Sequence, residues 1–181
     1  MQIIFHWFYC LPILNIVALL LTGTVLYIIL RKYTCGKRYW FPFSVIVFCA
    51  WIFVVFYGTI LNRPVSDEIM KPIIKPFYSY YIVFTGGEKE LLRENFMNII
   101  LFYPAGLLAC ELLPKSWNRV KRIVLVVCLS ALMSLGIEFF QFRFALGQAE
   151  VDDIIHNTLG ALIGAFICQL NASFSAQSAV K

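Results

Sequence analysis

Charged residues are scarce in this 181-residue chain, since Asp, Glu, Lys and Arg make up only 14% of it. Soluble globular domains carry about 25% charged residues, whereas here 61% of the residues are hydrophobic and 17% are aromatic. This balance excludes a disordered chain, a coiled coil, a disulfide-rich secreted scaffold and a nucleic-acid-binding module. It is typical of an integral membrane protein whose partner is the lipid bilayer, with room for about four to six spanning helices.

Signatures of cofactors, metals and common hydrolases are missing as well. The six cysteines include no CxxC pair, and the chain has no HExxH, GxSxG, P-loop or dinucleotide-binding glycine pattern. Asp152 and His156 lie four residues apart and could face one metal ion, but an interfacial histidine is the preferred interpretation. We therefore expect no metal and no cofactor. The N-terminal stretch lacks a basic region and a small-residue cleavage site, so no removable signal peptide is expected.

Five apolar segments predict five membrane-spanning helices, because backbone polar groups in lipid must find their partners within the segment. At about 1.5 Å per residue, each segment can cross a hydrocarbon core of about 30 Å. The predicted fold is an all-α, polytopic transmembrane helix bundle of about five spans, multi-pass in the cell membrane. The segments cover residues 8–30, 40–61, 95–113, 123–142 and 153–170.

Loop charges give this bundle an orientation. Residues 31–39 and 114–122 each contain four basic side chains and no acidic one. With five spans these two loops share one side, which the positive-inside rule makes cytoplasmic. The N-terminus is therefore predicted outside and the C-terminus inside. Eight of the ten acidic residues fall in the other two loops: Asp67, Glu68, Glu88, Glu90, Glu94, Glu150, Asp152 and Asp153.

The long outer loop, residues 62–94, contains Pro64, Pro72, Pro76 and a tyrosine-rich stretch at 77–81. Two interpretations of this stretch remain open. It forms an aromatic belt at the membrane interface, or it is a half-buried lid over an outward-facing pocket.

Polar residues inside a bilayer are costly, so those in the spans are functional candidates. Ser134, Glu138 and Gln141 are spaced by four and three residues and therefore share one face of the fourth span. Glu138 lies about 6 Å before the end of that span. Its carboxylate either snorkels to the outer surface or belongs to a site.

The fifth span begins with acidic residues, which have a structural explanation because carboxylates stabilise helix N-termini. Asp153 and Asn157 also share a stripe with Gly160 and Gly164. The two glycines form a GxxxG sequence, which favours close approach of another helix. This pattern directs the polar stripe toward the bundle interior.

The third span contains two asparagines and a proline. Asn95 is interpreted as the helix cap, whereas Asn98 lies one turn from Phe102 on a common face. Pro104 frees the carbonyl of Ile100 and predicts a kink in the helix.

The predicted orientation places polar residues from three spans in the outer half of the membrane. They predict an outward-open polar pocket where the third, fourth and fifth spans meet. Arg93 and Arg143 are the expected cations for pairing with Glu138 or Asp153. The polar set consists of Asn98, Glu138, Gln141, Asp153 and Asn157.

Three stretches, NIILFYPAG at 98–106, SLGIEFFQ at 134–141 and VDDIIHNTLGALIG at 151–164, resemble the VanZ-like family of membrane proteins. The resemblance implies a VanZ-like bundle at residues 40–171, an extra N-terminal helix and basic loop at 1–39, and a flexible tail at 172–181. The family usually has an arginine shortly before the acidic stretch, where this chain has Gln148. The polar and packing positions that the resemblance implies are Asn98, Pro104, Glu138, Gln141, Asp152, Asp153, Asn157 and Gly160.

A member of that family is associated with resistance to the lipoglycopeptide antibiotic teicoplanin, without an established reaction. One hypothesis is therefore a cell-envelope protein whose outer-leaflet pocket binds a lipid-linked or lipophilic amphiphile and so limits the access of such a drug. The alternative is an enzyme acting on a lipid-linked envelope substrate with Glu138 and Asp153 as acid and base. A proton-coupled transporter is a third option, disfavoured because Glu111, the one acid near the cytoplasmic end of a span, is expected to reach the interface. The sequence assigns no oligomeric state.

Overall fold

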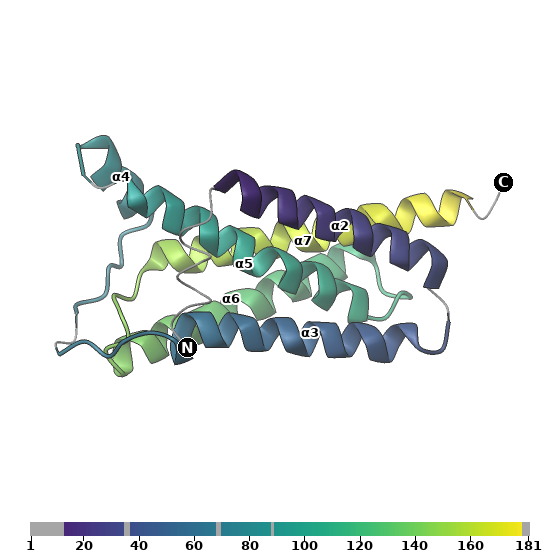
Figure 1. Ribbon diagram of the computed structural model, residues 1–181, viewed down its shortest axis with the longest axis horizontal. Helices are drawn as coiled ribbons and strands as arrows, with labels where there is room; N and C mark the ends of the chain where they lie inside the picture. The colour runs from purple at the N-terminus through teal and green to yellow at the C-terminus, as the bar shows by residue number, and fades with distance from the viewer. Residues whose placement is uncertain (1–12, 35–36, 68–69, 88, 179–181) are drawn as a thin grey trace.

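The computed structural model describes residues 13–34, 37–67, 70–87 and 89–178, and these form helices joined by loops. The long helices run along one common axis (Figure 1). The predicted all-α bundle is confirmed. Its elements are α2 (Ile13–Thr34), α3 (Trp40–Phe56), the π-helical turn η1 (Tyr57–Leu61), α4 (Tyr78–Phe84), α5 (Glu90–Leu112), α6 (Arg119–Arg143) and α7 (Val151–Ser178).

Each predicted span corresponds to one of these helices. Four described helices have the length and composition of a membrane span, namely Trp40–Leu61, Glu90–Leu112, Arg119–Arg143 and Val151–Asn171. The 22-residue α2 lies beside them and corresponds to the remaining predicted span. The first part of the predicted 8–30 segment lies outside the described residues, and α7 continues as a helix to Ser178.

The first residue of α5 differs from the predicted start of the third span. The third span was predicted to begin at Asn95 with that residue as its cap, but α5 begins at Glu90, one turn earlier. Asn95 is therefore inside the helix and only 4% exposed. Its amide is free to contact another element instead of its own backbone.

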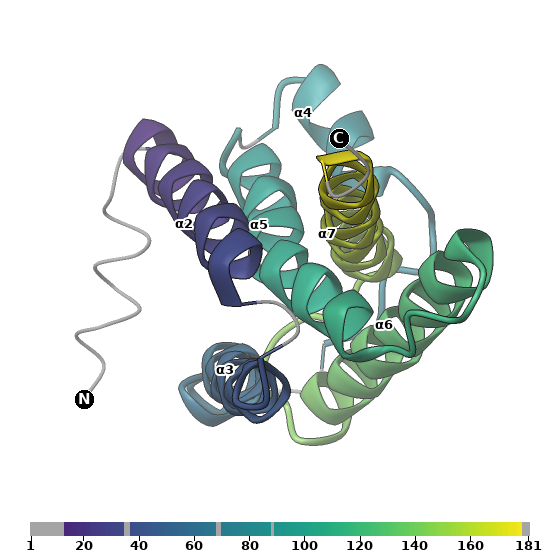
Figure 2. The same ribbon diagram turned by 90° about the vertical axis from the view of Figure 1, so that its right-hand side faces the viewer.

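Seen along the bundle, α5 lies at the centre and is flanked by α2, α3, α6 and α7 (Figure 2). The most extensive contact joins α5 to α7, where small residues let the two backbones meet. A Cβ atom at Gly160 would overlap the backbone of Ile99, and one at Gly164 would overlap the backbones of Tyr103 and Leu107. In the other direction, Gly106 of α5 lies against the backbone of Ala161. The GxxxG sequence thus packs on the third span, as its pattern indicates.

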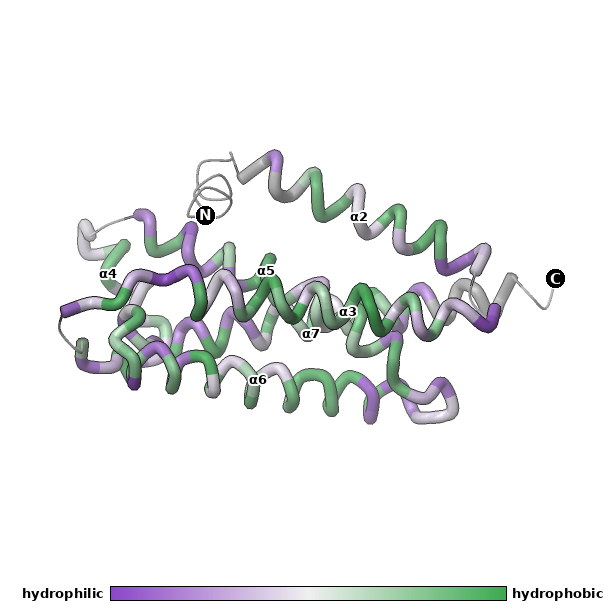
Figure 3. Tube along the Cα trace, turned by 60° about the horizontal axis from the view of Figure 1, so that its bottom comes forward, coloured by the Kyte–Doolittle hydropathy of each residue, from purple (hydrophilic) through white to green (hydrophobic). Residues whose placement is uncertain are grey.

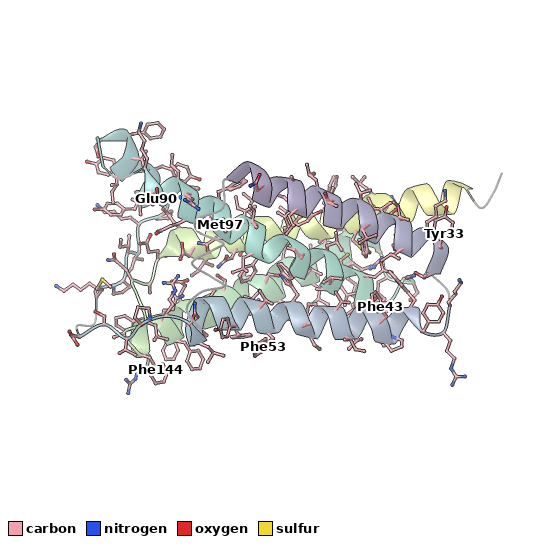
Figure 4. All side chains as sticks on the ribbon, viewed as in Figure 1. Tyr33, Phe43, Phe53, Glu90, Met97 and Phe144 are labelled. Atoms are coloured by element: carbon pink, nitrogen blue, oxygen red, sulfur yellow. The ribbon has the colours of Figure 1, made fainter. Side chains whose placement is uncertain are left out.

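The two ends of the bundle differ in charge. We call the end with the loops 62–77 and 144–150 the acidic end, and the end with the loops 35–39 and 113–118 the basic end (Figure 1). Glu90 and Phe144 lie at the acidic end and Tyr33 at the basic end (Figure 4). Hydrophobic residues dominate the middle of the helices and hydrophilic ones both ends (Figure 3). The two basic loops therefore share one end, as five spans require.

Glu111 near the basic end does not reach the interface, contrary to the prediction. It is 5% exposed and accepts hydrogen bonds from the Trp40 Nε1 at 3.0 Å and the Tyr27 hydroxyl at 3.1 Å. The Arg31 Nε lies 2.9 Å from its carboxylate and the Lys115 ammonium 3.6 Å. One buried carboxylate of α5 thus joins this helix to α2 and α3, because Tyr27 and Arg31 of α2 and Trp40 of α3 supply it with donors and a cation.

Candidate functional site

The predicted polar residues of three helices meet at the acidic end. The Asn98 amide of α5 donates to the Asp153 carboxylate of α7 at 2.7 Å. The Asn157 amide donates to the Ser134 hydroxyl of α6 at 2.8 Å, so the same stripe of α7 also contacts α6. The polar faces inferred from helical spacing therefore point into the bundle.

Glu138 is buried in this cluster and does not snorkel to the surface. It is 5% exposed, and its Oε2 accepts a hydrogen bond from the backbone N–H of Glu150 at 2.9 Å. Asp153 also acts on it electrostatically. Two carboxylates, one from α6 and one from α7, thus face each other at the end of the bundle.

The cation of this site is Arg63, which sequence reasoning missed in favour of Arg93 and Arg143. Arg63 interacts electrostatically with Glu138, Glu150 and Asp153. Arg93 instead pairs with Glu90 at 3.5 Å, and the Arg143 guanidinium lies over the Phe144 ring. We define the acidic-end cluster as Arg63, Asn98, Glu138, Glu150 and Asp153.

Gly147 makes room for this arginine. Its φ of +143° is one that residues with a side chain rarely adopt, and a Cβ there would lie 2.7 Å from the Arg63 Nη1. Gln148 has no contact of this kind and donates to the Lys71 carbonyl at 3.1 Å. The arginine beside this loop is therefore Arg63, from the turn after η1 and 85 residues before Gln148 in the chain.

Backbone hydrogen bonds hold the long outer loop over the cluster. The Ile73 N–H donates to the Ala149 carbonyl at 2.9 Å, and the Val151 N–H donates to the Ile73 carbonyl at 3.0 Å. Glu150, between these two partners, lies just outside the spans. Burial raises its pKa, and the nearby Glu94 and Asp152 raise it further, whereas Arg63 opposes them.

Asp152 anchors the short helix α4 rather than its own helix. Its Oδ2 accepts from the Ser79 backbone N–H at 2.9 Å and from the Ser79 hydroxyl at 2.5 Å, while Oδ1 accepts from the Phe77 N–H. The Asn95 amide completes the network by donating to the Ser79 hydroxyl at 2.8 Å. The carboxylate thus caps the N-terminus of α4 from outside.

The tyrosine-rich stretch combines features of both interpretations given to it. Phe77, Tyr81 and Phe84 are exposed, as in an aromatic belt, whereas Ser79 is 2% exposed and docked on α5 and α7. The Tyr80 hydroxyl hydrogen-bonds to the His156 Nε2 at 2.8 Å. The His156 Nδ1 lies 2.5 Å from the Asp152 carbonyl and donates to it. Both ring nitrogens of His156 are therefore occupied.

Gln141 is held by the end of the second span. In an α-helix the Thr59 carbonyl would accept from the N–H four residues on, but the Arg63 N–H bonds to Ile60 instead, and Pro64 has no N–H to offer. The Gln141 Nε2 donates to this carbonyl at 2.9 Å. π-Helical turns are rare in proteins, and those that occur are often at functional sites.

Two buried acceptor atoms at this end are left without a partner in the described structure. They are the amide oxygens of Gln141 and Asn157, whose residues are 1% and 2% exposed. Buried polar atoms are normally hydrogen-bonded. Together with the carboxylates, they make the site rich in hydrogen-bond acceptors.

Comparison with known proteins agrees with these features. A family model described as VanZ/LLP1 matches residues 41–172. Protein VanZ of Enterococcus faecium is 36% identical over 72 residues, which are 40% of this chain and 42% of that relative. No solved structure matches the chain. Because the family match covers most of the sequence and includes every helix of the acidic end, the chain belongs to the VanZ/LLP1 family.

Proposed function

We propose that this protein binds a lipid-linked or lipophilic amphiphile at the acidic end of its bundle and thereby lowers susceptibility to teicoplanin-type lipoglycopeptides. The observation that carries the proposal is the placement of the buried Glu138 and the half-buried Asp153 at one end of the bundle. There Asn98 and the Glu150 N–H donate to them, and Arg63 acts on both electrostatically. Carboxylates buried at a membrane interface are costly and are retained mainly where they act. The predicted orientation makes this end extracytoplasmic, where envelope precursors and lipoglycopeptides meet the membrane.

The hydrogen-bond acceptors at the acidic end indicate the chemistry of the amphiphile's head group. The acceptors are the carboxylates of Glu138 and Asp153 and the buried amide oxygens of Gln141 and Asn157. The two amide oxygens have no hydrogen-bond donor in the described structure. A head group that bears ammonium, amide N–H or hydroxyl groups supplies such donors. A head group of phosphate alone, with acceptors only, fits this end poorly.

Drug susceptibility tests this proposal directly. We expect expression of the wild-type chain in a teicoplanin-susceptible host to raise the inhibitory concentration of teicoplanin several-fold. Glu138→Gln and Asp153→Asn should abolish the increase, since each removes an acceptor charge without changing side-chain shape. Glu90→Gln is the matched control, because Glu90 lies at the same end but is exposed. An unchanged inhibitory concentration with correctly inserted wild-type protein would refute the proposal.

A second candidate is an enzyme, favoured by the unlike surroundings of the two facing carboxylates. Asp153 accepts from the Asn98 side chain, whereas Glu138 accepts from a backbone N–H. Such pairs can divide the roles of general acid and general base. Purified protein in detergent should then convert lipid-linked envelope precursors, and Glu138→Gln should abolish turnover. Turnover that EDTA removes would point to a metal, and absence of turnover across a broad lipid panel would exclude this candidate.

A further inference from the structure

A second feature lies on the opposite half of the molecule, away from the acidic-end cluster. An apolar groove with a volume of about 380 Å³ runs between α2 and α3 and has α5 as its floor. Figure 2 shows α2 and α3 next to the central α5. The groove is lined by side chains such as Leu20, Tyr27, Trp40, Trp51, Tyr103 and Leu107.

The groove has the length of one membrane leaflet. On α3 it extends from Trp40 to Trp51, which is about 17 Å at a rise of about 1.5 Å per residue. This is about half of a hydrocarbon core of about 30 Å. Because Trp40 begins α3 at the basic end, the groove covers the leaflet on that side.

Neither water nor the chain's own packing fills such a groove well. Apolar cavities of about 150 Å³ already stay dry and take up small apolar ligands. The wall nearest lipid contains Gly23, and a Cβ atom added there would meet nothing within 4 Å. Since the groove lies within the spans, the apolar molecule at hand to fill it is a hydrocarbon chain.

Positive charge stands at the basic end of the groove. Arg31 follows the groove-lining Leu30 and is 4% exposed. Its Nε is ion-paired with Glu111 at 2.9 Å, and its Nη1 has no hydrogen-bond partner in the described structure. Lys32, Lys37 and Arg38 are exposed close by in the chain. Basic residues at a membrane surface attract anionic lipid head groups, and a phosphate oxygen is a strong acceptor for a guanidinium.

We infer that the groove binds one anionic phospholipid from the basic-end leaflet, with an acyl chain between α2 and α3 and its phosphate at the Arg31 end. The lipid adds to the packing of α2. This helix joins the bundle through contacts of Thr24 with Tyr103 at 2.7 Å, Tyr27 with Trp40 and Arg31 with Glu111. This site is separate from the acidic-end cluster and does not depend on the proposed function.

Native mass spectrometry of the purified full chain tests this inference. With added phosphatidylglycerol, the wild type should retain one lipid per monomer after detergent is stripped, and neutral phosphatidylcholine should be retained far less. Gly23→Leu places a side chain in the groove and should weaken phosphatidylglycerol retention by about tenfold. Gly136→Leu is the matched control, since Gly136 of α6 also has open space around it but lies outside the groove.

Three outcomes would overturn the inference. Equal lipid retention by Gly23→Leu and wild type would show that the lipid is not bound in the groove. Equal retention of both lipids would show that the basic side chains at its end do not select the head group. A lipid-free dimer as the main species would mean that a second copy of the chain covers the groove. If circular dichroism shows that Gly23→Leu is misfolded, the inference is tested by tryptophan quenching in the wild type. Phosphatidylglycerol brominated in mid-chain should quench Trp51 with saturation at one lipid per protein, and unsaturable quenching would refute a bound lipid.

Discussion

The contact between Asp152 and α4 allows a quantitative test. The carboxylate accepts three hydrogen bonds, two from the backbone N–H groups of Phe77 and Ser79 and one from the Ser79 hydroxyl. Asp152 is 1% exposed, so water cannot replace the lost acceptor. Hydrogen bonds to charged groups contribute about 1.5–3 kcal/mol each.

Asp152→Ala should therefore release α4 from the bundle without unfolding the spans. Three bonds at the low end of that range sum to about 4.5 kcal/mol, which corresponds to more than a thousandfold in the local opening equilibrium. Ser79→Ala breaks two bonds, because the hydroxyl donates to Asp152 and accepts from the Asn95 amide. It leaves the two backbone donors paired and should cost about 2.5 kcal/mol, the sum of about 1.5 for the bond to the carboxylate and about 1 for the neutral bond. Asp152→Ala is expected to cost more free energy than Ser79→Ala because it breaks more hydrogen bonds.

Amide hydrogen exchange measured by mass spectrometry in nanodiscs reports this opening. Peptides covering Tyr78–Phe84 should lose protection in both variants, and the loss should be larger in Asp152→Ala than in Ser79→Ala. Peptides from α6 should exchange as in the wild type and serve as the internal control. If protection of α4 fell less than about tenfold in Asp152→Ala, that is by less than about 1.4 kcal/mol, the carboxylate would not be what holds this helix.

Three further predictions concern topology, packing and pH. In a background without native cysteines, Lys37→Cys and Asp67→Cys should be labelled by membrane-impermeant maleimide from opposite sides of the membrane, and labelling from one side would refute five spans. Gly164→Ala should lower the thermal stability by about 1–3 kcal/mol through overlap with α5, whereas Gly136→Ala, in open space, should be neutral or stabilising, and equal stabilities would contradict the close α5–α7 contact. Because its folded-state pKa is raised, ionisation of Glu150 should destabilise the fold as the pH rises above about 4.3, the usual glutamate pKa. Glu150→Gln should therefore gain stability relative to the wild type toward neutral pH in thermal unfolding followed by tryptophan fluorescence, and no pH-dependent difference would refute the shift.

Helical spacing was sufficient to predict which faces of the spans are polar. Ser134, Glu138 and Gln141 repeat with the period of a helix, and all three are buried as that period indicates. The predicted meeting of α5 with α7 follows from the same reasoning, because Asn98 and Asp153 each lie near a loop at the same end. Periodicity and the alternation of spans carry this information within single segments of the chain.

The contacts that sequence reasoning missed at the acidic end involve the outer loop and α4, whereas those of Glu111 at the basic end join three spans. Arg63 and Ser79 lie outside the predicted spans, so no helical pattern relates them to acids 73 to 90 residues away. Asn95 was interpreted as a cap because the start of a helix is poorly marked when no Ser, Thr, Asp or Asn precedes it. Asp152 is among the site residues that the sequence predicts, but its contact with α4 has no sequence signal, since an acid in a first turn also suits the dipole of its own helix in any fold.

The two buried charge clusters of this protein differ in how completely they are paired. Glu111 at the basic end has Arg31, Lys115 and two neutral donors around one carboxylate, which is the pattern of a structural ion pair between helices. At the acidic end, three carboxylates face one described arginine, and buried amide oxygens beside them lack donors. A fold that needed only to join its helices would gain nothing from this excess of acceptors, because every unpaired one costs desolvation free energy. We therefore propose that a ligand brings hydrogen-bond donors to the acidic end.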